Sequence, residues 1–362
     1  MPAATTTPGT DTVTVARSSA YRRIATEEAF ATADMLRQYR DVLARKSIAD
    51  IGFNSMWGFY LGSTSARATS IIERLQWLDE RRIADMDATG IDVQVLALTS
   101  PGAHIFDAAT GTALARASND ELAAAIARFP DRLAGMTAIA PQDPAAAAKE
   151  IERGVRTLGL HSVILNSHVH GEYLDDQKFW DIFAAAEACD AAIYIHPNTP
   201  SDRMIAPFLE AGLDGAIYGF GVETALHVLR LIVSGVFDRF PKLKVVIGHM
   251  GEALPYWLFR LDYMYRATLN SKRYPSWKPL RGVPSDYMRE NLYVTCSGMP
   301  WGPAITFAQQ VLGAERVLYA MDYPYQFVAS EVVACDEIVM SAADRKKFFQ
   351  TNAETVFRLT RS

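Results

Sequence analysis

The sequence predicts a single (β/α)8 barrel of the TIM type, an α/β fold. Eight short apolar runs recur along the chain, and segments with helical spacing of apolar residues lie between most of them. Strands that alternate with helices pair in parallel, and parallel strands buried on both faces are apolar throughout. Eight such units fit a chain of 362 residues in one closed barrel. An open doubly wound sheet is the alternative fold.

The expected strands are residues 22–30, 92–98, 133–140, 161–167, 191–197, 243–249, 292–298 and 316–322. Helices are expected at residues 120–130, 143–159, 176–190 and 221–241, where apolar residues repeat at helical spacing. The second of these helices has Pro144 in its first turn and Gly159 at its end, which is the usual placement of these two residue types.

Residues 31–90 fit this alternation poorly. Their first part is rich in Gly, Ser and aromatic residues and is long for a loop between a strand and a helix. We expect residues 31–70 to be an insertion near the active-site mouth, followed by a helix from about Ser70 to Thr89. The Thr- and Ala-rich residues 1–20 are expected to form a disordered tail, which leaves residues 21–362 as the barrel domain.

Composition excludes several classes of protein. The net charge is −5 and no Lys- or Arg-rich run occurs, which argues against nucleic acid or an anionic membrane as a partner. No apolar run reaches the roughly 18 residues of a membrane-spanning helix, and the amino-terminal residues lack the apolar core of a signal peptide. The three cysteines, Cys189, Cys296 and Cys335, have no metal-binding spacing. We therefore expect a cytoplasmic protein.

Ionisable side chains gather where the expected strands end. In a barrel, the carboxyl ends of the strands form the mouth at which enzymes act. Imidazole and carboxylate groups bind metals or transfer protons. Several of them converging on one mouth are hard to explain as solvated surface. The residues are Glu27, Glu28, His168, His170, His196, His249 and Asp322.

Four short motifs at these ends carry a resemblance. They are TEEAF at 26–30, IHP at 195–197, GHMGE at 248–252 and MDYPY at 321–325. Together they resemble the metal-dependent decarboxylase branch of the amidohydrolase superfamily, from about Arg22 to the end of the chain. That branch includes γ-resorcylate decarboxylases and aminocarboxymuconate semialdehyde decarboxylases, and the motifs are most similar to those of 5-carboxyvanillate decarboxylases. The resemblance implies an amidohydrolase-type barrel and a carboxy-lyase, an enzyme that breaks a carbon–carbon bond.

The resemblance also implies a metal site. Its ligands would be Glu27, His196 and Asp322, whereas Glu28 points the opposite way along its strand. Many members of the superfamily have a histidine two residues after the first ligand, where this chain has Ala29. No lysine ends the fourth strand, so a mononuclear site fits better than a dinuclear one. Two carboxylates and one imidazole suit Mn²⁺, which the resemblance favours, with Zn²⁺ as the alternative.

The resemblance assigns proton transfer to Asp322, His249 and Glu252. A carboxylate next to an imidazole fixes its tautomer and raises its basicity. Whether Asp322 or His249 delivers the proton stays open. Tyr325 is expected to line the substrate pocket. Arg67 either holds a substrate carboxylate or is a surface charge.

Two further expectations concern a second copy of the chain. The apolar and aromatic stretch 253–266, together with the resemblance, predicts a homodimer or a homotetramer. Arg260 in this stretch either reaches into the site of a neighbouring subunit, as in similar decarboxylases, or forms an ion pair within its own subunit. His227 lies on a helical apolar stripe and is expected to be a packed core residue.

The expected reaction is the metal-dependent, nonoxidative decarboxylation of a hydroxylated aromatic carboxylate. The aromatic insertion and Arg67 favour a ring with more than one anionic group, and 5-carboxyvanillate, which would give vanillate and CO₂, is the preferred substrate. No organic cofactor is expected, because the ring itself accepts the electrons. The alternative is a metal-dependent hydrolase of a lactone, ester or amide on the same barrel. A binding protein without catalysis is a third hypothesis.

Overall fold

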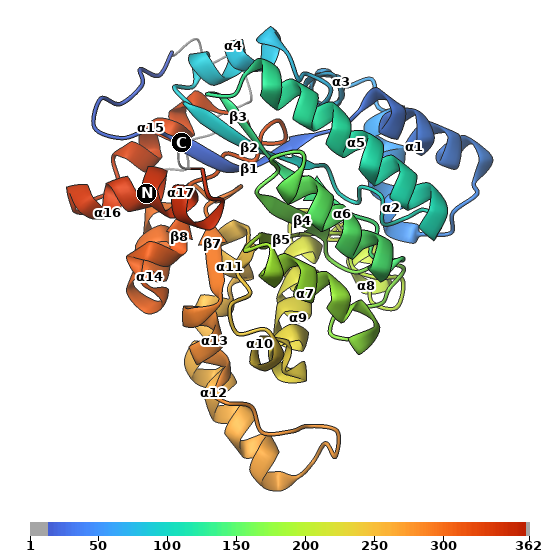
Figure 1. Cartoon of the computed structure of the whole chain (residues 1–362), viewed down its shortest axis with the longest axis vertical. Helices are drawn as coiled ribbons and strands as arrows, with labels where there is room; N and C mark the ends of the chain where they lie inside the picture. Colours follow the sequence, from blue (N-terminus) through green and yellow to red (C-terminus); the bar gives the residue numbers. More distant parts are fainter. Residues whose placement is uncertain (1–13, 360–362) are drawn as a thin grey trace.

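Eight parallel strands form the centre of the protein, described here over residues 14–359 by a computed structural model (Figure 1). Each strand pairs with the next in chain order. They are β1 (Ile24–Phe30), β2 (Val93–Leu98), β3 (Leu133–Ala138), β4 (Ser162–Asn166), β5 (Ala192–His196), β6 (Val245–Ile247), β7 (Leu292–Thr295) and β8 (Val317–Leu318). Nearly every strand residue is buried, because the barrel interior covers one face and the surrounding helices cover the other.

The last strand returns to the first. The backbone N–H of Thr26 donates to Tyr319 O at 3.2 Å, and the N–H of Ala29 donates to Tyr323 O at 2.6 Å. These bonds join β1 to the segment that follows β8 and complete the ring of strands. The (β/α)8 barrel predicted from the sequence is therefore confirmed, and the open doubly wound sheet is wrong.

The helices after β2 largely follow the expected alternation. They are α5 (Ala108–Arg128), α6 (Pro144–Arg156), η1 (Gln177–Phe179), α7 (Trp180–Ala188), α8 (Ala206–Ala211), α9 (Gly219–Ser234), α10 (Val236–Arg239), α11 (His249–Glu252), α12 (Leu254–Ser271), α13 (Pro284–Glu290), α14 (Gly302–Leu312), η2 (Ala314–Arg316), α15 (Ala329–Asp336), α16 (Ala342–Lys346), η3 (Lys347–Thr351) and α17 (Asn352–Val356).

Two helix boundaries differ from the expectation. The helix expected from residue 120 begins at Ala108, where the side chain of Asp107 accepts the N–H of Thr110 at 3.0 Å and caps the first turn. The helix expected over 221–241 is divided at Gly235, whose φ of 85° is left-handed and ends α9.

The segment between β1 and β2 is more regular than expected. It forms α1 (Ala33–Arg45), α2 (Ile51–Gly62), α3 (Ala66–Leu75) and α4 (Glu80–Ala88), so the single helix expected over residues 70–89 is in fact two. The break lies before Asp79, whose side chain accepts the N–H of Arg81 at 3.0 Å and starts α4. Trp57 of α2 donates from Nε1 to Ser100 O at 3.0 Å, which holds this helix against the loop after β2.

Residues 14–20 lie against the barrel domain. Val15 is buried, and its N–H donates to Ala88 O at 3.0 Å. Arg17 forms an ion pair with Asp87 at 2.5 Å. This part of the expected tail is thus packed on the carboxyl end of α4, and residues 1–13 lie outside the described part of the chain.

Helix α12 and the segment after it project from the barrel, as the orange arm in Figure 1 shows. Among residues 14–359, no helix is long and apolar enough to cross a membrane. The three cysteines are buried and free.

Candidate active site

Glu27 occupies the centre of the candidate site. It lies on β1, is 3% exposed, and accepts hydrogen bonds at Oε2 from the hydroxyl of Tyr194 and, at 3.1 Å, from that of Thr295. A Cβ at position 248 would lie 2.6 Å from the same oxygen, so Gly248 leaves the room that the carboxylate needs. The other oxygen, Oε1, is buried and has no hydrogen-bond partner within the described residues.

Two imidazoles face the unpartnered oxygen of Glu27. His196 Nε2 lies 3.5 Å from Oε1, and His249 Nε2 lies 3.8 Å from it. His196 Nδ1 lies 2.8 Å from the carbonyl oxygen of Pro197, which can only accept, so Nδ1 carries the proton and Nε2 presents its lone pair to Glu27. Burial lowers the pKa of His196, which favours this neutral form.

His249 begins a turn of unusual backbone conformation. Every residue from His249 to Ala253 has a positive φ, between 49° and 78°. Residues with a side chain rarely adopt this left-handed region, and strain of this kind gathers at functional sites. The turn brings Glu252 Oε1 to 2.7 Å from His249 Nδ1.

Two carboxylates favour the charged form of His249. Burial alone would lower the pKa of this imidazole. The negative charges of Glu252 and Glu27 outweigh burial and raise the pKa of His249 to about 10. The protonated ring can therefore donate at Nε2, on the side that faces the site.

Asp322 follows β8 and completes the group. Its φ of 69° is also left-handed. A Cβ at position 298 would lie 3.2 Å from His249 Cδ2 and 3.6 Å from Asp322 Oδ2, so both side chains border the space that Gly298 leaves open. Burial, and then the charge of Glu27, raise the pKa of Asp322 well above its ordinary value. This shift favours the protonated form of the carboxyl group as long as no cation is bound beside it.

The group fits a divalent metal ion in its donor chemistry. A buried carboxylate oxygen without a partner, an imidazole lone pair and a second carboxylate are hard and borderline donors, which suit Mn²⁺ or Zn²⁺. In residues 14–359, no three His, Cys, Asp or Glu side chains are already drawn together as a metal cluster. A cation would have to bring these side chains closer together.

Tyr325 and Arg67 lie together beside this group. The hydroxyl of Tyr325 is 2.6 Å from Thr99 Oγ1, and its ring centroid is 5.8 Å from that of Tyr60 on α2. Arg67 of α3 is exposed and donates from Nη2 to Tyr325 O at 2.8 Å. The positive charge of Arg67 acts on Asp322 and tends to lower the pKa of that carboxyl group.

In the described part of the chain, Arg260 shares no contact with the other residues that were predicted to bind substrate or metal. It is exposed on α12, and within residues 14–359 it forms no hydrogen bond or ion pair with another predicted site residue. The contacts of this single chain therefore leave its guanidinium group outside the site.

Sequence reasoning missed the two residues that orient Glu27. Tyr194 stands two residues before His196 on β5, and alternate strand residues face the same side, so this spacing could have revealed it. Thr295 on β7 has no such signal, because no ionisable residue follows it at the same strand end.

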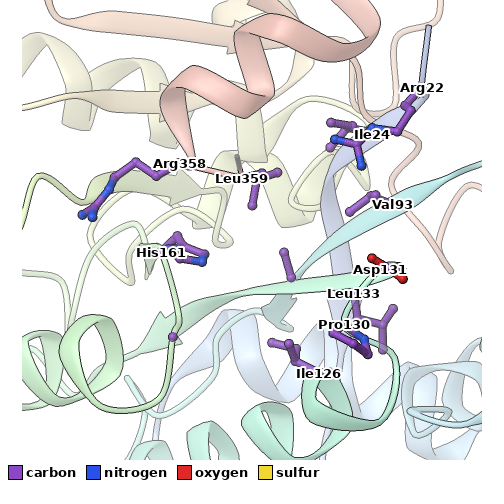
Figure 2. Close-up of a pocket in the computed structure, with 12 residues that line it drawn as sticks. Arg22, Ile24, Val93, Ile126, Pro130, Asp131, Leu133, His161, Arg358 and Leu359 are labelled. Carbon is purple, nitrogen blue, oxygen red and sulfur yellow. The ribbon is translucent and has the colours of Figure 1, made fainter. Parts of the chain in front are cut away.

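A cavity of about 220 Å³ lies at the opposite end of the barrel. Figure 2 shows its lining, which includes Val93, Leu133 and His161 near the amino ends of their strands. Two arginines line this cavity. Arg22 forms an ion pair with Glu354 at 2.7 Å, and Arg358 donates to Cys189 O at 2.9 Å, so both guanidinium groups are bound by other residues of the protein. Barrel enzymes act at the carboxyl ends of the strands, so this cavity is not the candidate site.

Comparison with known proteins agrees with this geometry. The profile of the amidohydrolase family matches residues 66–359. A γ-resorcylate decarboxylase of Polaromonas sp. (strain JS666) is 35% identical over 297 residues, which are 80% of this chain and 90% of the relative. This chain therefore spans nearly the whole of that relative.

Solved structures of related enzymes share the fold. The 5-carboxyvanillate decarboxylase of Novosphingobium aromaticivorans DSM 12444, complexed with manganese and 4-hydroxy-3-methoxy-5-nitrobenzoic acid, is 54% identical, with a TM-score of 0.93 over 97% of this chain and 100% of that one. The 5-carboxyvanillate decarboxylase of Sphingomonas paucimobilis is 40% identical, with a TM-score of 0.88 over 94% and 99% of the two chains. The present chain thus belongs to the amidohydrolase family and is one of its decarboxylases, a carbon–carbon lyase.

Proposed function

We propose that the protein catalyses the nonoxidative decarboxylation of a hydroxylated aromatic carboxylate, and that its substrate is 5-carboxyvanillate, which gives vanillate and CO₂. The observation that carries this proposal is the position of two acid–base groups, Asp322 and His249, beside the unpartnered oxygen of Glu27. A decarboxylase of this kind must supply one proton to the ring for each CO₂ that leaves. The related enzymes named above are decarboxylases of such rings by name.

We assign Glu27, His196 and Asp322 as the ligands of one divalent metal ion. The free lone pair of His196 and the free oxygen of Glu27, 3.5 Å apart, support this assignment. When bound, the metal supplies positive charge that orients the carboxylate and phenolate oxygens of the substrate. Manganese in related structures favours Mn²⁺, whereas intrinsic affinities favour Zn²⁺, and metal analysis of the purified protein decides between them.

In the proposed reaction, Asp322 takes up a proton from His249 and passes it to the ring carbon that bears the carboxylate. The C–H bond forms while the O–H bond breaks, and the phenolate oxygen becomes a ketone. The C–CO₂ bond then breaks, its electron pair restores the aromatic ring, and CO₂ departs. His249, held by Glu252 at 2.7 Å, returns a proton to Asp322. No organic cofactor is required, because the ring is the electron sink.

We further propose that Arg67 binds the second carboxylate of the substrate. Arg67 is exposed beside Tyr325, and its charge already acts on the site. The rings of Tyr60 and Tyr325 lie beside it and offer an aromatic surface to the substrate ring. In the compound bound by the Novosphingobium enzyme, a nitro group stands where 5-carboxyvanillate carries the carboxylate that leaves as CO₂, and its one carboxylate corresponds to the one that we propose Arg67 binds.

We also propose that two copies of the chain associate through α12. Its side chains Tyr256, Phe259 and Tyr263 are 78%, 85% and 63% exposed, which is unusual for large aromatic residues of one helix. A symmetric dimer would cover them and would give Arg260, on the same helix, a site to reach in the partner. Light scattering tests this proposal, since a fully active monomer at working concentration would reject it.

The substrate proposal is tested by steady-state kinetics of the Mn²⁺-loaded protein. We expect kcat/KM for 5-carboxyvanillate to exceed that for γ-resorcylate by at least about tenfold, which corresponds to about 1.4 kcal/mol of transition-state binding. The reverse order would leave the reaction class standing and reject the substrate. Hydrolysis of lactones, esters or amides in the same assay, without CO₂ release, would favour the hydrolase.

A further inference from the structure

We propose that Glu28 is a positioning residue that holds Asp322 in the conformation needed for metal binding and proton transfer. Glu28 is the neighbour of Glu27 in the chain, but its carboxylate contacts a different part of the site. The proposal rests on the function proposed above for Asp322 and assigns a role to a residue outside the proposed ligand set and proton relay.

The carboxylate of Glu28 accepts the two backbone N–H groups that flank Asp322. The N–H of Met321 donates to Oε1 at 2.9 Å, and the N–H of Tyr323 donates to Oε2 at 3.1 Å. Glu28 is fully buried, so no water competes for either oxygen. One side chain thus fixes the peptide groups on both sides of Asp322.

These two hydrogen bonds stabilise a backbone conformation that Asp322 would not keep without such contacts. Asp322 has a φ of 69°, in the left-handed region that residues with a Cβ rarely adopt. A residue stays in such a conformation only when its surroundings over-determine it. The two hydrogen bonds to Glu28, with that from the N–H of Ala29 to Tyr323 O at 2.6 Å, supply this constraint.

Glu28 itself is held from outside the barrel by α4. Arg82 of this helix is fully buried and donates to Gln94 Oε1 at 2.9 Å, and Gln94 Nε2 lies 3.5 Å from Glu28 Oε2. The same guanidinium group donates to Ala29 O at 2.7 Å and lies 4.4 Å from the ring centroid of Tyr323. Arg82 therefore supports both Glu28 and the residue after Asp322.

The arrangement links two proposed ligands through adjacent residues of one strand. Neighbouring side chains of a strand point to opposite faces, so Glu27 and Glu28 of β1 reach different partners. Glu27 is bound by side chains of β5 and β7, and Glu28 by the backbone after β8. A change at Glu28 should therefore act on Asp322 and leave the hydrogen bonds of Glu27 in place.

The test compares Glu28→Gln with Thr26→Val. The glutamine keeps the shape but places an NH₂ group against one of the two N–H donors. Thr26 is the matched control, because its buried hydroxyl also bonds the segment after β8, at Tyr319 O and 2.8 Å, but not the peptides beside Asp322. Calorimetry of the metal-free proteins with Mn²⁺ gives the affinity, and thermal unfolding gives the stability of each.

We expect Glu28→Gln to weaken Mn²⁺ binding by about tenfold or more, the usual effect of losing a residue that orients a metal ligand. Its kcat should fall in parallel while KM for the aromatic carboxylate changes less than about threefold. Thr26→Val should leave both within about twofold of wild type. A folded Glu28→Gln protein with wild-type affinity and kcat would overturn the proposal.

Hydrogen exchange of the wild-type protein provides a test that needs no variant to fold. If Glu28 holds the segment, the amides of Met321 and Tyr323 are protected in the metal-free protein as well as with Mn²⁺. Protection that appears only with Mn²⁺ would show that the metal orders the segment and would reject the role of Glu28. The Mn²⁺ affinity and the hydrogen exchange can both be measured even if 5-carboxyvanillate is not turned over. Failure of the proposed function is therefore distinguished from failure of this inference.

Discussion

The imidazole Nδ1 of His249 and the carboxylate Oε1 of Glu252 lie 2.7 Å apart across a turn whose backbone is left-handed throughout. A right-handed turn would be less strained. The left-handed one directs Nδ1 to Glu252 while Nε2 faces Glu27, at 3.8 Å from its Oε1. The pair therefore joins a buried carboxylate to a proton carrier whose other nitrogen faces the site.

Glu252→Gln should lower kcat by about 100-fold, within the range of lost acid–base catalysis. Glu252 is one of the charges that raise the pKa of His249 to about 10, so the pKa of His249 should fall in the variant. His249 acts protonated, and activity is lost as pH rises through its pKa. The basic limb of the kcat–pH profile should therefore move to lower pH.

The matched control for this variant is Glu290→Gln, which removes an exposed carboxylate that pairs with Arg281 at 2.6 Å, outside the proposed proton relay. Its profile should equal that of wild type. An unmoved basic limb in Glu252→Gln, at saturating Mn²⁺, would show that His249 does not return the proton to Asp322.

Tyr194→Phe should weaken Mn²⁺ binding by about tenfold, because Glu27 loses the hydroxyl that orients its Oε2. Tyr287→Phe is the control, since it removes the hydroxyl of another buried tyrosine, whose partner is Asp238. Titration calorimetry measures both. Equal affinities in the two variants would mean that Glu27 keeps its orientation without Tyr194.

Arg67→Gln should raise KM for 5-carboxyvanillate by about 10- to 100-fold, since a charged hydrogen bond to the second carboxylate is lost. γ-Resorcylate has one carboxylate and serves as the internal control, so its KM should change little. Parallel changes in the two KM values would mean that Arg67 positions Tyr325, to whose carbonyl oxygen it donates at 2.8 Å, and does not bind the second carboxylate.

The stability of the protein should depend on pH through His227. As predicted from the sequence, it is fully buried in the core, where burial lowers its pKa to about 3. Unfolding restores a pKa of about 6.5, so the unfolded chain binds an additional proton below that value. The folding stability contributed by neutral His227 is complete above pH 6.5 and is lost as pH falls toward 3.

Urea unfolding at pH 7 and pH 5 measures this contribution. From pH 7 to pH 5, the free energy of unfolding of wild type should fall by about 2 kcal/mol more than that of His227→Gln, which has no titrating group at this position. The glutamine variant is less stable at both values, so the comparison is made between the two pH-dependent losses. Equal losses would mean that His227 is protonated in the folded protein.

Much of the barrel and the placement of its ionisable residues could be predicted from the sequence. Apolar runs that end in Glu27, His196 or Asp322 are local signals, and parallel pairing brings their ends to one mouth. The four helices between β1 and β2 were harder to predict, because α2 is apolar around much of its surface and lacks a clear helical stripe.

The remaining features depend on contacts between distant residues. The left-handed turn from His249 to Ala253 follows no local preference, since only one of its five residues is glycine. Glu28 could be excluded from the metal ligands by strand alternation, but its bonds to Met321 and Tyr323 join residues nearly 300 positions apart. No spacing in the sequence reports such a contact.

The most direct test of the central claim is a coupled assay of Mn²⁺-loaded protein with 5-carboxyvanillate, in which vanillate is followed by absorbance and CO₂ is measured in the same sample. We predict equal amounts of vanillate and CO₂, and loss of both in Asp322→Asn. Absence of CO₂ from this substrate and from a panel of small hydroxybenzoates, or full activity of Asp322→Asn, would contradict it.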